Sequence, residues 1–288
     1  MNLPSSHVAQ VTYRTMPARF MPLPQITSRS NPKVRQAASL RNRKQRDSLG
    51  QTIVYGVRET ARALAAGGEA VRAMACPKLF RGDDPHAVVS QLLEAGCEVL
   101  EVTEEVFERI AYGDRLDGLA TIFQTRVRSL SELKVPSGSL VAVIEGIEKP
   151  GNLGAILRSA DGAGVDAIVL VDPVIDLFNP NAIRSSVSTV FKPNIGVASP
   201  HQALEWLQGG GFSMWAARPD ADQLYSTANF TSPTALLLGN EAEGLTPFWD
   251  SVGVQGISLP MLGLADSLNV STAAAVLFYE ACRQRGGR

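Results

Sequence analysis

The chain has 288 residues, of which 45% are hydrophobic and 19% are charged, and its formal net charge is −1. At roughly 150 residues per domain, this length predicts two domains, each able to bury a core without disulfides. No apolar run approaches the ~18 residues of a membrane span, and the three cysteines and three histidines form no metal-ligand pattern, so we expect neither a membrane protein nor a metal protein.

The first 46 residues are strongly basic, because they hold nine Lys or Arg residues and no Asp or Glu. Since the whole chain carries −1, the remaining residues carry −10. Such segregation is typical of a segment that contacts a polyanion, and nucleic acid is the natural candidate. A solvated basic tail without function, or an organelle transit peptide, is the alternative.

Residues 1–30 contain scattered prolines without helical or strand periodicity, which predicts an extended or disordered arm. Asn31 and Pro32 favour a helix start, and no further Gly or Pro occurs until Gly50. We therefore expect one helix from residue 32 to residue 49, which carries most of the basic charge.

Short apolar runs alternate with helical segments through residues 31–125, which predicts a small α/β domain. Residues 126–138 are polar and are the predicted linker. Residues 139–288 repeat the alternation with continuous apolar runs at 141–144, 167–171 and 235–238, which are typical of parallel strands buried on both faces. The predicted fold class is thus α/β, with a parallel sheet in the second domain and a closing helix over residues 267–285.

One dinucleotide-binding pattern fails on its context. Gly162, Gly164 and Ala167 fit GxGxxA, but a helix is predicted before them and a strand after them, the reverse of the required order. We interpret these glycines as the end of a helix. The absence of GxxxxGK[ST] and GxSxG leaves phosphate-loop NTPases and α/β-hydrolases without their usual signals.

Two predicted strands of the second domain run directly into glycine-rich turns, where functional chain segments are common. Strand 141–144 leads to GNLGAILRSA, in which Asn152 can cap the next helix and Arg158 projects toward the strand ends; a plain helix cap with a surface arginine is the alternative. Strand 235–238 leads to GNEAEGL, in which Gly239 lets a ligand approach the backbone and Glu241 can bind hydroxyl or amino groups.

A third segment, SLPMLGLADSLNVSTAAA, places Ser267, Asn269 and Ser271 at the start of the last helix, more polar residues than one cap needs. In this order, GNLGAILRSA, LLLGNEAEGL and the third segment resemble the three motifs of the TrmH-like branch of the SPOUT superfamily, which are RNA 2′-O-ribose methyltransferases. Residues 31–64 also look like the RNA substrate-binding domain of the members that modify rRNA.

This resemblance implies a second domain whose carboxyl-terminal part passes through a loop to form a deep trefoil knot, a rare exception to unthreaded chains. It also implies the cofactor S-adenosylmethionine, held mostly by backbone groups in the knot. The implied cofactor-binding positions are Leu238, Gly239, Asn240, Leu259 and Leu268.

By the same resemblance Arg158 is the central catalytic residue, and Asn152, Glu241, Ser267 and Asn269 shape the site around it. A guanidinium with a pKa above ~12 is a poor proton acceptor. We therefore expect Arg158 to bind the phosphate next to the target ribose and to stabilise the developing alkoxide, with solvent or another group as the base.

The resemblance further implies a homodimer through the knot and the closing helix, although the apolar face of that helix fits core packing equally well. In this interpretation the basic helix contacts RNA phosphates, which gives affinity without sequence choice. Its candidate RNA-binding residues are Lys33, Arg35, Arg41, Arg43, Lys44 and Arg46.

The chain departs from the family pattern at Ser188, where many members have glycine in a Ser-x-Gly element, so the local packing there is in question. The expected substrate is rRNA, most simply that of the large subunit. The alternatives are a tRNA target, a non-catalytic assembly factor and a nicotinamide-dependent oxidoreductase. Unpaired, widely spaced cysteines predict the cytoplasm, or an organelle matrix if residues 1–30 are a transit peptide.

Overall fold

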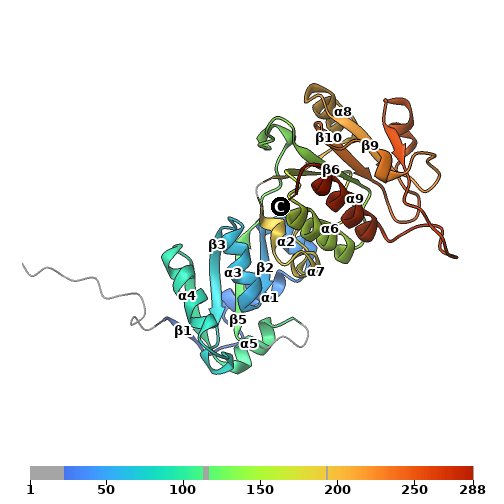
Figure 1. The fold of residues 1–288 in the computed structure, drawn as a ribbon. Helices are drawn as coiled ribbons and strands as arrows, with labels where there is room; N and C mark the ends of the chain where they lie inside the picture. Colours follow the sequence, from blue (N-terminus) through green and yellow to red (C-terminus); the bar gives the residue numbers. More distant parts are fainter. Residues whose placement is uncertain (1–22, 113–116, 193, 288) are drawn as a thin grey trace, which may run out of the picture.

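Two β-sheets organise the chain, as Figure 1 shows for a computed structural model that describes residues 23–112, 117–192 and 194–287. The first sheet has the strand order β1-β4-β3-β5-β2, in which β1, β4 and β3 are parallel and β5 is antiparallel to both of its neighbours. Its strands are β1 (Gln25–Ile26), β2 (Gln51–Tyr55), β3 (Ala70–Ala75), β4 (Glu98–Val102) and β5 (Leu119–Gln124).

Helices cover both faces of this first sheet. One face packs against α1 (Pro32–Ser39) and α5 (Glu104–Ile110), and the other packs against α3 (Val57–Ala65) and α4 (Asp84–Glu94). The prediction of a small α/β unit is thus confirmed for the described residues. The precise domain boundaries stay predictions.

The structure differs from the sequence interpretation at the basic segment. The single helix expected up to Gly50 is two helices, because Asn42 accepts a hydrogen bond from Lys44 N and so caps a new helix, α2 (Arg43–Leu49). Residues 1–22 of the expected arm lie outside the described residues. Within its remainder, Gln25–Ile26 forms β1 and pairs with β4, so part of the arm belongs to the sheet.

The second sheet is entirely parallel, in the order β11-β9-β10-β6-β7-β8. On β6, Ala142 and Ile144 face a core shared with α6 and α9, whereas Val141 and Val143 face a core shared with α8. Burial on both faces explains the continuous apolar runs. The strands are β6 (Leu140–Glu145), β7 (Ala167–Val171), β8 (Ile195–Ala198), β9 (Ser213–Ala217), β10 (Thr234–Leu238) and β11 (Gln255–Ile257), and the helices are α6 (Pro150–Ala163), α7 (Pro180–Ser185), α8 (Pro200–Gly209) and α9 (Val270–Gln284).

Strand order reverses between β6 and β10. From β6 the chain moves outward through β7 and β8, and it then returns to the other side so that β10 lies beside β6. Ligands of open parallel sheets bind outside the carboxyl ends of the strands at such a switch point. The threading of the chain end through a knot stays a prediction.

The two sheets are joined by a shared core beside α7 and β2 (Figure 1). Phe123 of β5 packs against Phe191 with ring centroids 5.0 Å apart, and Thr52 Oγ1 donates a 2.8 Å hydrogen bond to Phe178 O. The predicted linker is packed against the second unit. Leu130 is buried, and the backbone of Arg128 forms an isolated parallel β-bridge with Gly196 of β8.

Ser188, the departure from the family pattern, lies in this junction. Its φ of 67° is in the left-handed region where glycine is favoured, and Val187 beside it has a φ of 52°. The side chain is fully buried, and its Oγ donates a 2.8 Å hydrogen bond to Glu59 O of α3. The serine therefore keeps the backbone path of a glycine while adding a bond between the two units.

Candidate active site

The turn after β10 closes on itself at the switch point. Asn240 N donates to Gly244 O at 2.9 Å and Gly244 N donates to Asn240 O at 3.0 Å. A Cβ on Gly239 would lie 2.1 Å from the Gly244 carbonyl carbon, so only glycine permits this close return of the chain. The sequence interpretation explained Gly239 by the close approach of a ligand to the backbone. The structure adds a second reason, because the returning chain leaves no room for a side chain.

Glu145, the last residue of β6, holds the segment that follows this turn. Its buried carboxylate accepts hydrogen bonds from Thr246 N at 2.7 Å, Thr246 Oγ1 at 3.0 Å and Trp249 Nε1 at 3.0 Å. Sequence reasoning missed this residue. Its only signal was a carboxylate at the end of an otherwise apolar strand, which is too common a pattern to identify a role.

Three motif residues from distant parts of the sequence meet beside the turn. Asn152 Nδ2 donates to Glu241 Oε1, and Asn269 Nδ2 donates to Asn152 Oδ1 at 3.3 Å. Asn269 also caps α9, because its Oδ1 accepts from Ser271 N at 2.9 Å. The expectation that Asn152 caps its helix is wrong: α6 begins at Pro150 after Lys149, and Asn152 instead links the α6 and α9 starts to Glu241.

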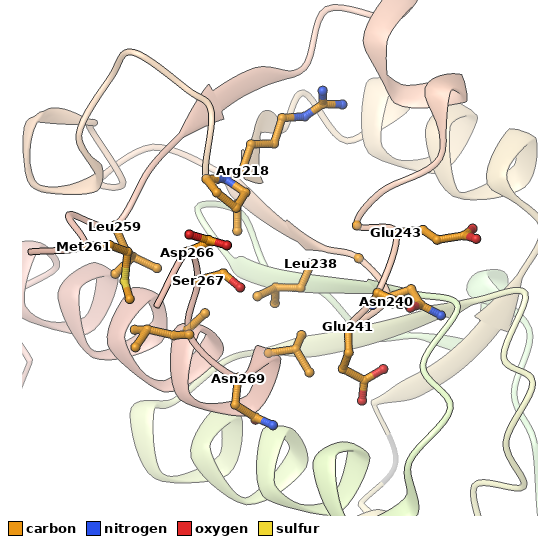
Figure 2. A pocket seen from close by; sticks show the side chains of 18 of the residues that line it. Arg218, Leu238, Asn240, Glu241, Glu243, Leu259, Met261, Asp266, Ser267 and Asn269 are labelled. Atoms are coloured by element: carbon orange, nitrogen blue, oxygen red, sulfur yellow. Dashed lines mark hydrogen bonds between the residues drawn. The ribbon is translucent and has the colours of Figure 1, made fainter. Parts of the chain in front are cut away.

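A cavity of about 450 Å³ opens next to this cluster (Figure 2). Leu238, Leu259 and Leu268 contribute apolar side chains to its lining, and Glu241, Ser267 and Asn269 contribute polar ones. All five positions expected to hold the cofactor line it, Leu238, Gly239, Asn240, Leu259 and Leu268.

The cavity has a further wall that sequence reasoning missed. Ala217, Arg218 and Ile257 reach it from the carboxyl ends of β9 and β11, and Arg218 forms an ion pair with Asp250. Alternating strands and helices could have indicated these strand ends, but both strands are short and neither leads into a recognisable motif.

Arg158 stands apart from the cavity. Arg158 is exposed on the surface of α6. It is not among the described residues that line the cavity. The expected projection toward the strand ends is therefore not seen within a single chain.

Several basic residues assigned to RNA have structural partners instead. Arg46 is buried at 3% exposure and pairs with Asp176, so it cannot reach a phosphate, and its assignment is wrong. Arg41 donates to the carbonyls of Arg109, Ile110 and Ala111 at the end of α5. Lys33 pairs with Glu98, and Arg43 donates to Val174 O and lies 3.6 Å from an oxygen of Asp47. Arg35 and Lys44 are exposed.

Comparison with known proteins agrees with this arrangement. Residues 139–279 match the SpoU rRNA Methylase family, and residues 31–121 match the MRM3-like substrate binding domain. A 23S rRNA (guanosine-2'-O-)-methyltransferase, RlmB, of Ralstonia nicotianae is 32% identical over 66% of this chain and 79% of that protein. The chain belongs to the SpoU rRNA methylase family.

Solved structures resemble both units of this SpoU family member. A crystal structure of an RNA 2'-O ribose methyltransferase shares 38% identity and a TM-score of 0.78, and it covers 91% of this chain and 99% of its own. The AdoMet-bound rRNA methyltransferase of Sinorhizobium meliloti shares 28% identity and a TM-score of 0.80, over 91% of this chain and 98% of its own.

Two further findings concern the described residues only. They contain no helix that is long and apolar enough to cross a membrane. They also contain no group of three or more His, Cys, Asp or Glu residues arranged to hold a metal ion.

Proposed function

We propose that this SpoU family enzyme transfers the methyl group of S-adenosylmethionine to a ribose 2′-hydroxyl of rRNA, most simply 23S rRNA. The observation that carries the proposal is the Asn152, Glu241 and Asn269 cluster, which borders an apolar-walled cavity at the switch point of the sheet. The MRM3-like substrate binding domain in the first unit supports an RNA substrate.

The cavity suits the cofactor in size and chemistry. About 450 Å³ lies within the usual range of small-molecule sites, roughly 300–1,000 Å³. Leu259 and Leu268 would cover the adenine, and the backbone from Leu238 to Asn240 would supply polar contacts. When bound, the sulfonium supplies a methyl group that an oxygen nucleophile can take.

The protein groups would position that oxygen and favour its charge. The Asn152 amide and the Glu241 carboxylate are already oriented by their mutual hydrogen bond, so they can hold ribose hydroxyls without reorganising. We assign Arg158 to the phosphate beside the target ribose, where its positive charge stabilises the developing alkoxide. Ser267, which lines the cavity, is assigned a supporting contact, and solvent or another group takes the proton.

A homodimer would reconcile Arg158 with the cavity, because its exposed face of α6 could then reach the cavity of a second copy. The segment before α9 supports such an interface. Leu262 and Leu264 are 98% and 104% exposed, and Tyr279 of α9 is 54% exposed, an unusual set of apolar side chains to leave in water. We place the dimer interface on this segment and the neighbouring faces of α6 and α9.

Transfer of tritium from labelled S-adenosylmethionine tests the reaction. Total rRNA and tRNA from a strain lacking the gene serve as substrates, with Arg158→Ala as the test variant and Arg126→Ala as the control, because Arg126 is exposed on the linker. We expect label in a 2′-O-methyl nucleotide of 23S rRNA, lost in Arg158→Ala and kept in Arg126→Ala. Label on tRNA alone would overturn the rRNA assignment. Cofactor binding without any labelled RNA would favour the assembly factor.

Complementation tests the dimer. Arg158→Ala and Gly239→Ala chains are each expected to be strongly impaired, and mixing them in equal amounts after mild dissociation should restore about one quarter of the sites if Arg158 serves the partner's cavity, because half of the dimers are mixed and each has one intact site. Light scattering of the wild-type chain gives the oligomeric state directly. A monomer in solution, or no recovery in mixed dimers, would show that Arg158 does not act in the cavity of a second copy.

A further inference from the structure

The side chain of Asn240, a residue that lines the cavity, is engaged by the protein itself. Its Nδ2 donates to Gly146 O and to Glu148 Oε1, both at 3.1 Å, and its Oδ1 accepts from Ala242 N at 2.7 Å. An amide nitrogen has two hydrogens, so both are used. In Figure 2 the Asn240 amide extends away from the side of the cavity where Leu259 lies. The side chain is therefore not free to hold a cofactor.

The two ends of this amide make different kinds of contact. Oδ1 bonds within the turn 239–244, which the two backbone bonds between Asn240 and Gly244 also close. Glu145 holds the segment after the turn. The turn therefore keeps its shape without Nδ2. In contrast, Nδ2 reaches a loop that lies more than ninety residues earlier in the sequence, the loop 146–149.

The loop 146–149 joins β6 directly to α6. Its last residue, Lys149, lines the cavity. In the first turn of α6, Asn152 donates from Nδ2 to Glu241 Oε1. Two consecutive residues of the turn, Asn240 and Glu241, thus hold the loop and the helix start that follows it. The start of α6 is attached to the turn at two points along the chain.

The turn and the helix start have different tasks in the proposed reaction. The turn 239–244 borders the cavity assigned to the cofactor, and α6 carries Asn152, which is assigned to the ribose. Group transfer requires the reacting atoms to lie roughly 3–3.5 Å apart and in line, and a displacement of about 1 Å can slow it on the order of 100-fold. The position of α6 relative to the turn therefore affects the rate of transfer more than the affinity for the cofactor.

We propose that Asn240 is a positioning residue for methyl transfer. Its Nδ2 holds the loop 146–149 and so sets the first turn of α6, with Asn152, at reacting distance from the bound cofactor. The side chain acts through Gly146 and Glu148 and does not itself contact the cofactor. The proposal rests on the methyltransferase function proposed above, and it separates the role of this side chain from that of the backbone beside it.

Asn240→Asp tests the proposal because it changes only one end of the amide. The variant keeps Oδ1 for Ala242 N, but it replaces Nδ2 with an oxygen that faces two acceptors. With rRNA from the strain lacking the gene, we expect kcat to fall about 10- to 100-fold. The Kd for S-adenosylmethionine, measured by calorimetry, should stay within about threefold. Asn229→Asp is the matched control, because Asn229 is exposed and uses only its Oδ1, which accepts from Thr231. It should change neither quantity.

A second variant separates the lost hydrogen bond from the added charge. In the double variant Asn240→Asp, Glu148→Gln, the new glutamine amide can donate to the new carboxylate, so the bond is restored with its direction reversed. The double variant also has the net charge of the wild type. We expect it to recover kcat at least about threefold over Asn240→Asp, with the Kd for S-adenosylmethionine again unchanged.

The outcomes distinguish this proposal from the proposed function. If the wild-type chain methylates rRNA but Asn240→Asp keeps its kcat, or the double variant recovers nothing, Asn240 does not position the reaction and the enzyme assignment stands. A rise of more than about tenfold in the Kd for S-adenosylmethionine in Asn240→Asp would make the side chain a cofactor ligand and overturn the proposal. If the wild-type chain binds the cofactor but methylates no RNA, both proposals are wrong.

Discussion

Arg46 and Asp176 form a nearly buried ion pair that joins the two units of the protein. An Arg46 nitrogen lies 2.6 Å from Asp176 Oδ2, and the side chains are 3% and 10% exposed. Arg46 also donates to Leu40 O and Arg41 O, both at 2.8 Å, so its guanidinium is saturated by the protein. Arg46, which the charge pattern of the sequence had assigned to RNA binding, thus stabilises the contact between the two units.

Removing one partner of this pair should destabilise the protein strongly. Asp176→Ala leaves a buried guanidinium without its counterion, and we expect a loss of about 3–5 kcal/mol in the free energy of unfolding. Asp47→Ala is the control, because its pair with Arg43 is exposed and should contribute under about 1 kcal/mol. Urea unfolding of both variants measures the difference. Equal losses would contradict the prediction.

Gly239→Ala should weaken cofactor binding without unfolding the protein. The new Cβ would collide with the backbone at Gly244 and Leu245, so the turn that borders the cavity must open. We expect the Kd for S-adenosylmethionine, measured by calorimetry, to rise on the order of tenfold or more, or about 1.4 kcal/mol. Gly209→Ala, where a Cβ meets nothing within 4 Å, should leave it unchanged.

Glu145→Ala should weaken both stability and cofactor binding, although Glu145 does not line the cavity. The change leaves Trp249 Nε1 and Thr246 N without their acceptor, at a cost of about 1–3 kcal/mol for a buried donor. Released from Glu145, the segment after Gly244 should also bind the cofactor more weakly. A variant with normal stability and normal cofactor affinity would show that Glu145 does not support this segment.

Ser188 offers a pair of substitutions with different expected outcomes. Ser188→Gly loses the hydrogen bond to Glu59 O but relieves the left-handed backbone, so the two effects of about 1 kcal/mol each should nearly cancel. Ser188→Ala loses the bond and keeps the strain, and we expect it to cost about 1–2 kcal/mol. Chemical denaturation that ranks glycine below alanine in stability would refute this explanation.

The acid stability of the protein should depend on Glu280. Hydrogen bonds from Arg283 lower the pKa of this carboxyl to about 2. Because the folded pKa lies below that of an unfolded glutamate, near ~4.3, the stabilisation is complete above that value and is lost as the pH falls toward 2. We expect the free energy of unfolding of Glu280→Gln, measured with urea, to fall less than that of the wild type between pH 4.5 and 2.5, by about 1 kcal/mol, since Arg283 is exposed and screened. Parallel curves for the two proteins would contradict this.

Local sequence patterns were sufficient to predict most of the strands and helices and the order of the motifs. The apolar runs at β6, β7 and β10 predicted a parallel sheet covered on both faces, because only strands without a solvent face lose the alternation of polar residues. The same reasoning failed at residues 40–42, where one side-chain cap on Asn42 interrupts an apparently continuous helix. Such a break depends on a single hydrogen bond, which propensity alone does not reveal.

By itself the sequence identified the candidate site residues: Asn152, Arg158, Glu241 and Asn269 stand in motifs whose residue types and order can be read from the linear chain. The tertiary structure alone decided which of them meet, because the hydrogen bonds between Asn152, Glu241 and Asn269 join positions about a hundred residues apart. It also decided that Arg46 faces Asp176 and that Tyr112 stacks on Tyr55. The physical reason is that a side chain's type is a local property, whereas its burial and its partners depend on how distant segments pack.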